Sequence, residues 1–353
     1  MRFLAREGFE CTYESFEDRA LNEVIYTEGN YGKKTWCILK AFMRRLALVP
    51  DIRKYDAIFI YEEASRIGPA IIERLIHRAG VPIVYDFCDP IYMAYKSRKN
   101  SYLSYLKFFG KTATICRLSQ HVLVGNRDLA SYALQHNPRV TIVPITIDLV
   151  EYTEKTYPPR ASENRVPTIG WTGSHSTLWF LEGAGGMLRE LRRAREFELR
   201  VLGAAGFQLE GVSVRAEPWS PAREVSFLHE CDIGIMPIAD FEWARLRSHL
   251  KVRQYMAVGL PSVASPAGVI ADLIQDGVNG FLATSPDEWI QKLTLLLDEP
   301  ALRQSIGKKA RQTIAQCCAA EPWAREVGQI IRSAVNEKSG ASPQSKIASA
   351  TRA

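Results

Sequence analysis

The stretch that decides the fold is FEWARLRSHLKVRQYMAVGLPSVASPAGV, residues 241–269. Its first half interleaves cations with apolar residues, which predicts a helix with one packed face. Its second half, PSVASP, reads as a short buried strand bounded by turn residues. Four cations lie near the start of the helix: Arg245, Arg247, Lys251 and Arg253. The helix dipole disfavours positive charge there, so an anion that is not part of the protein would explain the arrangement.

The same alternation of short apolar strands and longer helical patterns extends along the chain in both directions. Continuous apolar strands separated by helices indicate parallel sheets that are covered on both faces. We expect strands at 57–61, 82–87, 121–125 and 141–145, and, after a proline-containing linker at 151–167, at 168–171, 197–203, 212–219, 232–238, 261–266 and 280–283. The chain is therefore predicted to be an α/β protein.

A length of 353 residues exceeds what one core usually fills, so two domains are expected. We predict an N-terminal domain over 1–155, a C-terminal domain with closing helices over 156–336, and a polar disordered tail over 337–353. Doubly wound sheets bind ligands at the carboxyl ends of their strands. Two such domains facing each other would form a central binding cleft.

Composition excludes several classes of protein. The net charge of +6 favours anionic partners but is far from the basic stripe of a nucleic-acid binder. Seven scattered cysteines, without a C-x-x-C pair, indicate reduced thiols in a cytosolic protein. No apolar run approaches the ~18 residues that span a bilayer, and the N-terminus lacks a signal-peptide layout. Any membrane contact is expected to be peripheral, at the inner face.

The motifs of several other enzyme classes are missing. The GKT at 110–112 has Tyr105 where a P-loop needs its first glycine, and no G-x-G-x-x-G follows a strand. No D-x-D triplet occurs, and no histidines pair at metal-ligand spacing. We therefore expect no metal and no other cofactor.

From residue 168 onward the sequence resembles the retaining GT-B glycosyltransferases of family 4, also called glycosyltransferase group 1. The resemblance is carried by IGWTGSHSTLWFL (169–181), by 237–269, by DLIQDGVNGFLA (272–283) and by the pattern at 287–314. The first domain agrees more weakly, at 62–69, 85–90 and 124–130. The resemblance implies two Rossmann-like domains and transfer of a hexosyl group, with retention, from a nucleotide-diphosphate sugar to a glycan or lipid-linked acceptor.

Two groups of residues are predicted to hold the donor diphosphate. The turn GWTGSHST would offer the backbone N–H groups of Gly173, Ser174 and His175 at a helix start; the alternative is an ordinary turn capped by hydroxyls. Arg245 and Lys251 would offset the charge that builds on the leaving diphosphate. Their alternative is a solvated basic face.

The resemblance implies further donor contacts. Asp240 is in step with the motif of one branch, P-x-x-D-x-x-W-x-R-G-K. Gln254 occupies the position of a ribose-binding glutamate, and its amide keeps hydrogen-bonding capacity. The backbone at Gly268 and Val269 would line the sugar. Asp272 is either a donor contact or an acid that complements a helix dipole.

This chain departs from the family at two places that bear on the donor. The common family pattern has two glutamates eight positions apart, and here Leu246 and Gln254 occupy those positions. The closer branch has a glycine followed by a lysine where this chain has Leu246 and Arg247. A carboxylate contact to the transferred sugar is therefore not expected from these positions.

The first domain offers two acceptor-side features. Asp86 and Asp89 follow a strand and would orient an acceptor hydroxyl or cap a loop. The basic and aromatic stretch 92–117 would lie on an anionic membrane surface, or its aromatics would be core and its lysines solvated. The opening RFLAREGFECTYESF predicts a helix end, a stop at Gly8 and a strand.

Relatives in the family open with an earlier strand, so about one strand, one turn and part of a helix are expected to be absent. Losing a central strand leaves backbone groups of its neighbours unpaired. Two alternatives to an active transferase therefore stay open: a degenerate protein that binds a nucleotide sugar or a partner without turnover, and a GT-B-fold nucleotide-sugar epimerase.

Overall fold

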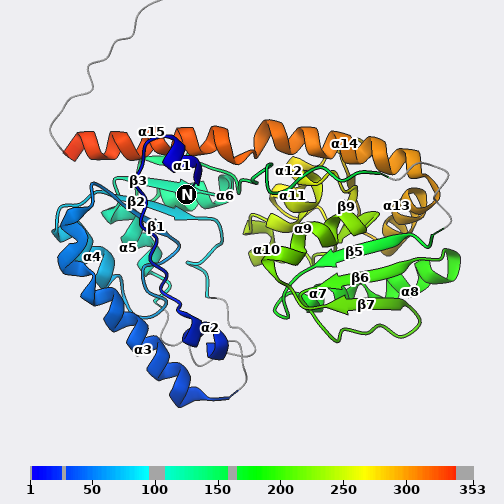
Figure 1. Ribbon diagram of the computed structural model, residues 1–353, viewed down its shortest axis with the longest axis horizontal. Coiled ribbons are helices and arrows are strands. Elements are labelled where there is room, and N and C mark those ends of the chain that lie inside the picture. Colours follow the sequence, from blue (N-terminus) through cyan, green and yellow to red (C-terminus); the bar gives the residue numbers. More distant parts are fainter. Residues whose placement is uncertain (1, 26–28, 95–107, 158–164, 339–353) are drawn as a thin grey trace, which may run out of the picture. The chain divides into compact units, whose positions relative to one another are not determined.

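The structure is a computed structural model that describes residues 2–25, 29–94, 108–157 and 165–338. The chain divides into two compact units (Figure 1), one formed by Met1–Val143 with Ala324–Ala353 and the other by Pro144–Trp323. The two units are described separately below as the first and the second unit.

The first unit contains a parallel sheet in the consecutive order β1 (Ile58–Tyr61), β2 (Ile83–Phe87), β3 (His121–Val124) and β4 (Val140–Ile142). Its helices are α1 (Arg2–Arg6), α2 (Arg19–Ile25), α3 (Tyr31–Ala47), η1 (Val49–Lys54), α4 (Ile71–Arg78), α5 (Lys111–Leu118), α6 (Arg127–Leu134) and most of α15 (Ala320–Lys338). β2 is buried on both faces. Tyr85 packs in a core with α4, α5 and α6, and Val84 packs against Ile331 of α15.

The second unit contains six parallel strands in the order β10-β9-β8-β5-β6-β7. They are β5 (Thr168–Thr172), β6 (Glu198–Leu202), β7 (Ser213–Glu217), β8 (Ile233–Met236), β9 (Ser262–Ala264) and β10 (Phe281–Leu282). The chain winds outward from β5 to one edge and then from β8 to the other. The sheet is therefore doubly wound, and its topological switch point lies between β5 and β8.

Helices cover both faces of this second sheet (Figure 1). They are α7 (Leu178–Gly183), α8 (Gly185–Ala194), α9 (Pro221–Glu230), α10 (Glu242–Leu246), α11 (Leu250–Ala257), α12 (Val269–Leu273), α13 (Pro286–Asp298) and α14 (Pro300–Cys317). α8 and α13 share one core with β5, β6 and β8. α11 and α14 share a second core. The ten strands expected from the sequence are confirmed, and so is the α/β fold class.

The structure divides the chain differently from the sequence prediction. Residues 144–155 belong to the second unit, because Ile147 N–H donates to Cys318 O at 2.7 Å and Lys155 N–H donates to Val258 O at 2.8 Å. The end of α15 belongs to the first unit, because its apolar side chains cover β2 and β3. The predicted tail at 337–353 lies outside the described residues from 339 onward.

The strand predicted after Gly8 is wrong. Helix α1 and the turn at Gly8, with φ +85°, are present, but residues 9–14 form no strand. Phe9 instead packs beside α15, where the Arg332 guanidinium lies 4.7 Å above its ring. A parallel strand forms only where a neighbouring strand pairs with it. Phe9 packs against helix α15 instead, so no strand forms here.

Residues 95–107 of the basic and aromatic stretch 92–117 lie outside the described residues. In the described part, Lys111 is buried, donates to Ser65 O and lies 3.2 Å from a Glu63 carboxylate oxygen. Tyr92 stacks on Tyr132 with ring centroids 3.6 Å apart. Phe108, however, is 51% exposed. The described part therefore matches neither alternative throughout, and membrane contact stays a prediction.

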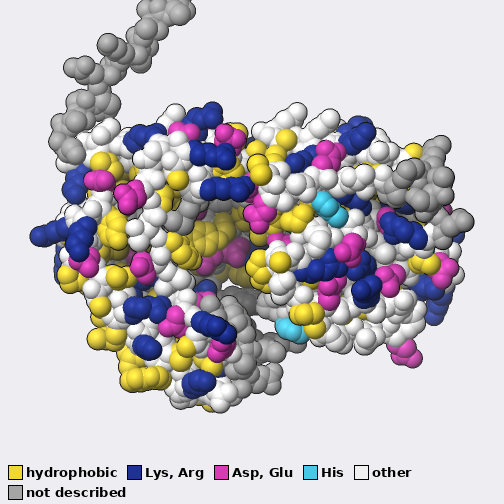
Figure 2. Space-filling model, in the orientation of Figure 1, with side chains coloured by type: hydrophobic (Ala, Val, Ile, Leu, Met, Phe, Trp, Pro, Cys, Tyr) yellow, Lys and Arg dark blue, Asp and Glu magenta, His cyan; other side chains and the backbone are white. Residues whose placement is uncertain are grey.

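No helix within the described ranges combines the length and apolarity needed to cross a membrane. The face drawn in Figure 2 mixes Lys and Arg with Asp and Glu, and no single-sign stripe crosses it.

Candidate functional site

A cavity of about 430 Å³ opens at the carboxyl edge of the second unit's sheet. It lies at the switch point, since residues that end β5 and residues that end β8 both line it. Ligands of doubly wound sheets bind in this place. The lining residues on which the argument depends are Gly173, Ser174, Glu224, Arg247, Lys251 and Gln254.

Two glycines shape the floor of the cavity. A Cβ on Gly173 would lie 2.1 Å from the Trp171 ring and 2.7 Å from Lys251 Nζ. A Cβ on Gly203, which has φ +99°, would lie 2.0 Å from Gly173 O. Only glycine fits both positions, because the Trp171 ring lies against Gly173 and the end of β5 lies against Gly203. The Gly173 N–H donates to Leu202 O at 2.9 Å. It is therefore not available to a phosphate, which corrects the sequence prediction.

Lys251 reaches into the cavity from the first turn of α11. Its Nζ lies 4.8 Å above the Trp171 ring and donates to Thr177 Oγ1 at 3.1 Å. Burial, and then the like charge of Arg247, lower the pKa of Lys251 to about 7. Among the described residues, no carboxylate contributes to this shift. Lys251 is thus a cation that forms no ion pair with a described carboxylate, although Glu224 lines the same cavity.

The structure does not bring Arg245 to the cavity. Arg245 is exposed on α10 and forms an ion pair with Asp240, with Nε to Oδ1 at 2.5 Å and Nη2 to Oδ2 at 2.8 Å. Hydrogen bonding to Arg245 lowers the pKa of Asp240. Arg247, two residues further on, lines the cavity instead, and its guanidinium lies 4.5 Å above the Trp243 ring.

Gln254 lines the cavity as expected, but it is joined there by a carboxylate. Its Nε2 donates to Tyr152 Oη at 2.6 Å and to Glu224 Oε2 at 3.0 Å. Tyr152 Oη also donates to Glu224, and Trp219 Nε1 donates to Glu224 Oε1 at 2.9 Å. Three donors from three segments therefore fix one carboxylate at the cavity wall.

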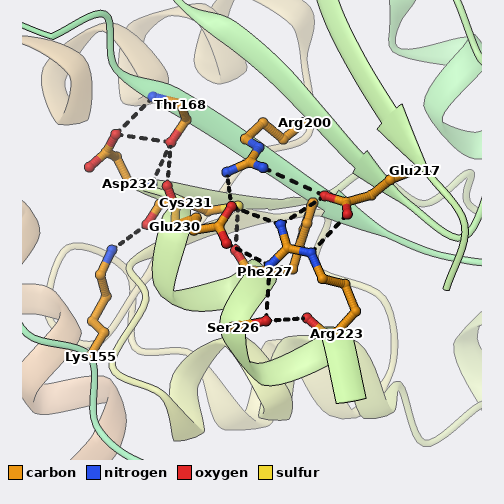
Figure 3. A network of polar contacts seen from close by, with 10 residues as sticks. All are labelled: Lys155, Thr168, Arg200, Glu217, Arg223, Ser226, Phe227, Glu230, Cys231 and Asp232. Atoms are coloured by element: carbon orange, nitrogen blue, oxygen red, sulfur yellow. Dashed lines mark hydrogen bonds and ion pairs between the residues drawn. The ribbon is translucent and has the colours of Figure 1, made fainter. Parts of the chain in front are cut away.

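Ion pairs within the second unit hold the helix that carries Glu224 (Figure 3). Arg223 pairs with Glu217 on β7 at 2.8 Å and with Glu230 at 2.5 Å, and Arg200 on β6 also pairs with Glu230. Hydrogen bonds from Arg223 are the main reason that the pKa of Glu230 falls to about 2. These contacts tie α9 to two strands and so fix the position of Glu224.

The loop before α11 is held in an unusual backbone conformation. His249 is buried at the N-terminal end of this helix with φ +47°, in the left-handed region that non-glycine residues rarely adopt. Its Nε2 pairs with Ala244 O at 2.7 Å. The buried Arg253 guanidinium donates to the carbonyls of Ser248 and His249. Arg253 is therefore a structural cation that fixes the loop leading to Lys251.

The remaining predicted donor residues lie outside the lining of this cavity. His175 lines a neighbouring hollow of about 450 Å³ with residues 204–209. Gly268, with φ +51°, precedes α12, and a Cβ there would lie 1.8 Å from Arg245 O. Val269 and Asp272 lie on α12. Their contacts to a donor stay predictions.

The first unit has its own acidic group at the carboxyl end of its sheet. Asp86 is the penultimate residue of β2 and pairs with Tyr61 of β1, and its carbonyl accepts from Glu62 N–H at 2.7 Å. Burial, and then the charge of Glu62, raise the pKa of Asp86 to about 7. Asp89 follows in the loop, where its carbonyl accepts from Ile91 N–H at 2.8 Å. A carboxyl group that titrates near neutrality can accept or donate a proton.

Sequence reasoning missed Glu224, Tyr152 and Trp219. Glu224 looks like an ordinary acid in the first turn of α9, and its partners lie 72 and 5 residues away. The one local feature that could have indicated a site at Glu224 is Trp219, which directly precedes the N-cap Ser220 of α9.

Two parallel α/β units with a cavity at the switch point of the second define a GT-B fold, and solved structures of this class are similar to the chain. Sucrose-phosphate synthase from Thermosynechococcus elongatus has a TM-score of 0.59 and 14% identity over 87% of this chain and 80% of that one. The Anabaena protein HepE in complex with UDP-glucose has a TM-score of 0.59 and 15% identity over 82% of each chain. Trehalose-6-phosphate synthase OtsA has a TM-score of 0.58 and 11% identity over 88% of this chain and 80% of that one. At these identities the similarity shows the fold.

The sequence of the second unit points to one family. Residues 167–299 match the model of the family described as glycosyl transferases group 1, over less than half of the chain. No curated protein sequence matches the chain. The matched segment contains every residue named above that lines the cavity, whereas Tyr152, which hydrogen-bonds Glu224, lies before it.

Proposed function

We propose that the protein is a glycosyltransferase that moves a hexosyl group from a nucleoside-diphosphate sugar to a glycan or lipid-linked acceptor, with retention and without a metal. The observation that carries the proposal is Lys251, a cation in the cavity of the second unit whose pKa burial lowers to about 7. A bound diphosphate would supply the counter-charge that the described residues do not.

The cations would act on the leaving group. When the bond between the anomeric carbon and the diphosphate oxygen breaks, negative charge builds on that oxygen, and a fixed ammonium group stabilises it. Lys251 and Arg247 line the cavity for this role. Arg245 would join them only if it left Asp240. In the retaining route proposed here, the acceptor attacks from the face that the diphosphate leaves, and its proton passes to a phosphate oxygen.

Glu224 would recognise the ribose of the donor. A carboxylate has about four acceptor sites, and the three protein donors leave Glu224 one of them for a ribose hydroxyl. Gln254, in the position of the family's glutamate, would position this carboxylate through its 3.0 Å hydrogen bond. The chain would thus keep a carboxylate at the ribose, supplied by Glu224, although Gln254 replaces the glutamate of the family.

Calorimetric titration with UDP, GDP, ADP, CDP and dTDP tests the donor site. We expect one nucleotide to bind best, and Lys251→Met to weaken it at least tenfold. Glu224→Gln should weaken a ribonucleotide more than its 2′-deoxy analogue, while Glu182→Gln, in the neighbouring hollow, is the matched control. Absence of binding by every nucleotide would refute the proposal.

Turnover is tested by release of the nucleoside diphosphate from labelled donors, with and without a chelator. Loss of turnover in chelator would contradict the metal-free route. Binding without turnover, with any acceptor offered, would favour the degenerate binding protein over the transferase.

A further inference from the structure

Two consecutive cysteines at the end of α14 lie in direct contact. Their Sγ atoms are 3.2 Å apart. Cys317 is exposed, whereas Cys318 is 2% exposed. The backbone of Cys318 is held on both sides, since its N–H donates to Ile314 O at 2.9 Å and its carbonyl accepts from Ile147 N–H at 2.7 Å. The two sulfurs are thus fixed together, with one of them open to solvent.

A buried cation faces this pair. Arg253 is 3% exposed, and its Nε has no hydrogen-bond partner within the described ranges. The hydrogen bond from Cys317, and then the charge and hydrogen bonding of Arg253, lower the pKa of Cys318, whereas the same pairing raises the pKa of Cys317. A buried guanidinium needs a counter-charge. These shifts favour a pair that shares one proton, whose single negative charge would balance the charge of Arg253.

We propose that Cys317 and Cys318 form a redox-reactive dithiol that hydroperoxides convert into a disulfide. Cys317 passes its proton to Cys318, and its thiolate attacks one peroxide oxygen. The O–O bond breaks, leaving a sulfenic acid on Cys317, and the departing oxygen takes up a proton and leaves as water or as an alcohol. Cys318 then attacks the Cys317 sulfur, the S–O bond breaks, and the second oxygen leaves as water. Two electrons pass from the sulfurs to the peroxide, and the one proton of the pair together with one proton from solvent ends on the released oxygens.

The disulfide has a consequence for the cavity, and this part rests on the proposed function. Oxidation removes the negative charge that faces Arg253. The same guanidinium donates to the carbonyls of Ser248 and His249, and these residues lead directly to Lys251. Without its counter-charge, Arg253 holds this loop less firmly, so nucleotide affinity falls when the pair is oxidised.

The test uses the full chain, fully reduced and then titrated with hydrogen peroxide. After remaining thiols are alkylated, mass spectrometry of peptides should show the 317–318 peptide losing two hydrogens before Cys11 or Cys37 is modified. At pH 7 we expect alkylation of the pair to be about tenfold faster than that of Cys11, because the shared proton leaves one sulfur of the pair as a thiolate. Cys317→Ser and Cys318→Ser should abolish the disulfide, and Cys37→Ser should leave it intact.

Two outcomes overturn the dithiol: both sulfurs staying reduced at a dose that oxidises Cys11 and Cys37, or alkylation of the pair no faster than that of Cys11. Both are measured on the unmutated chain, so a variant that fails to fold does not affect them. Nucleotide titration of the reduced and oxidised protein forms a separate arm. Equal affinity in the two states refutes the link to the cavity. Absence of binding in both refutes the proposed function and leaves the dithiol standing.

Discussion

Replacing Lys251 by methionine should stabilise the protein while weakening nucleotide binding. Folding lowers the pKa of Lys251 from 10.5 to about 7, which corresponds to a cost of about 5 kcal/mol for keeping the charge in the pocket. The substitution also removes the cation–π contact with Trp171, worth ~1 kcal/mol, and the hydrogen bond to Thr177, worth ~1 kcal/mol. A net gain of about 2 to 3 kcal/mol follows.

For a unit of this size, that gain raises the Tm by roughly 5 to 10 °C. The effect depends on pH in a fixed direction. The unfolded chain binds more protons than the folded chain between pH 7 and pH 10.5, so the stability of the unmutated protein rises with pH across this window. The advantage of the variant is therefore full at and below about pH 7 and disappears as pH approaches 10.5.

Differential scanning calorimetry from pH 6 to pH 10 measures this difference directly. Lys292→Met is the matched control, because Lys292 is also mostly buried but pairs with Asp276 at 2.9 Å; it should lose stability. A Lys251→Met protein that melts below the unmutated one at pH 7, or that binds nucleotide equally well, would show that the lysine is not an uncompensated cation.

Three further predictions concern the same unit. Nucleotide affinity should fall as pH rises above about 7, by up to tenfold per unit, because the diphosphate needs protonated Lys251; titrations in buffers of different ionisation enthalpy would report the proton uptake. Gly173→Ala places a methyl group 2.1 Å from the Trp171 ring and should cost at least tenfold in nucleotide affinity, whereas Gly186→Ala, with open space around it, should cost none. Glu230→Gln should lower the Tm at pH 7, and the difference from the unmutated protein should shrink as pH falls from 4.5 toward 2, where the glutamate itself becomes protonated.

The parts of this fold that the sequence predicted are those set by local pattern. Most of the strands are short apolar runs, β7 (SVRAE) being an exception, and their parallel pairing follows from the alternation with helices. Lys251 and Gln254 both line the cavity, because one helix turn separates them and the turn after Trp171 lies at the adjacent strand end. Their contacts to a donor stay predictions. The motif around them is long enough to predict the positions of both residues.

The parts that the sequence could not predict depend on partners distant in the chain or on competition between near ones. Arg245 was predicted to bind the diphosphate, but it forms an ion pair with Asp240 instead. Glu224 owes its place to Tyr152, which precedes the second sheet altogether. The strand expected after Gly8 failed because Phe9 packs on a helix more than 300 residues later. Periodicity carries no signal for such contacts.

The return of α15 to the first unit has a consequence for synthesis on the ribosome. One face of β2 and β3 is covered by Ile331 and Ala334, which are translated after the whole second unit. Domains usually fold in order as they emerge, but here the first sheet keeps an apolar face open while the entire second unit is made. The second unit, continuous from Pro144 to Trp323, can close first. In a nascent chain stalled before Ala324, the second unit could be folded while the first unit still lacked the helix that covers its sheet. We expect such a chain to bind chaperones through the exposed apolar face.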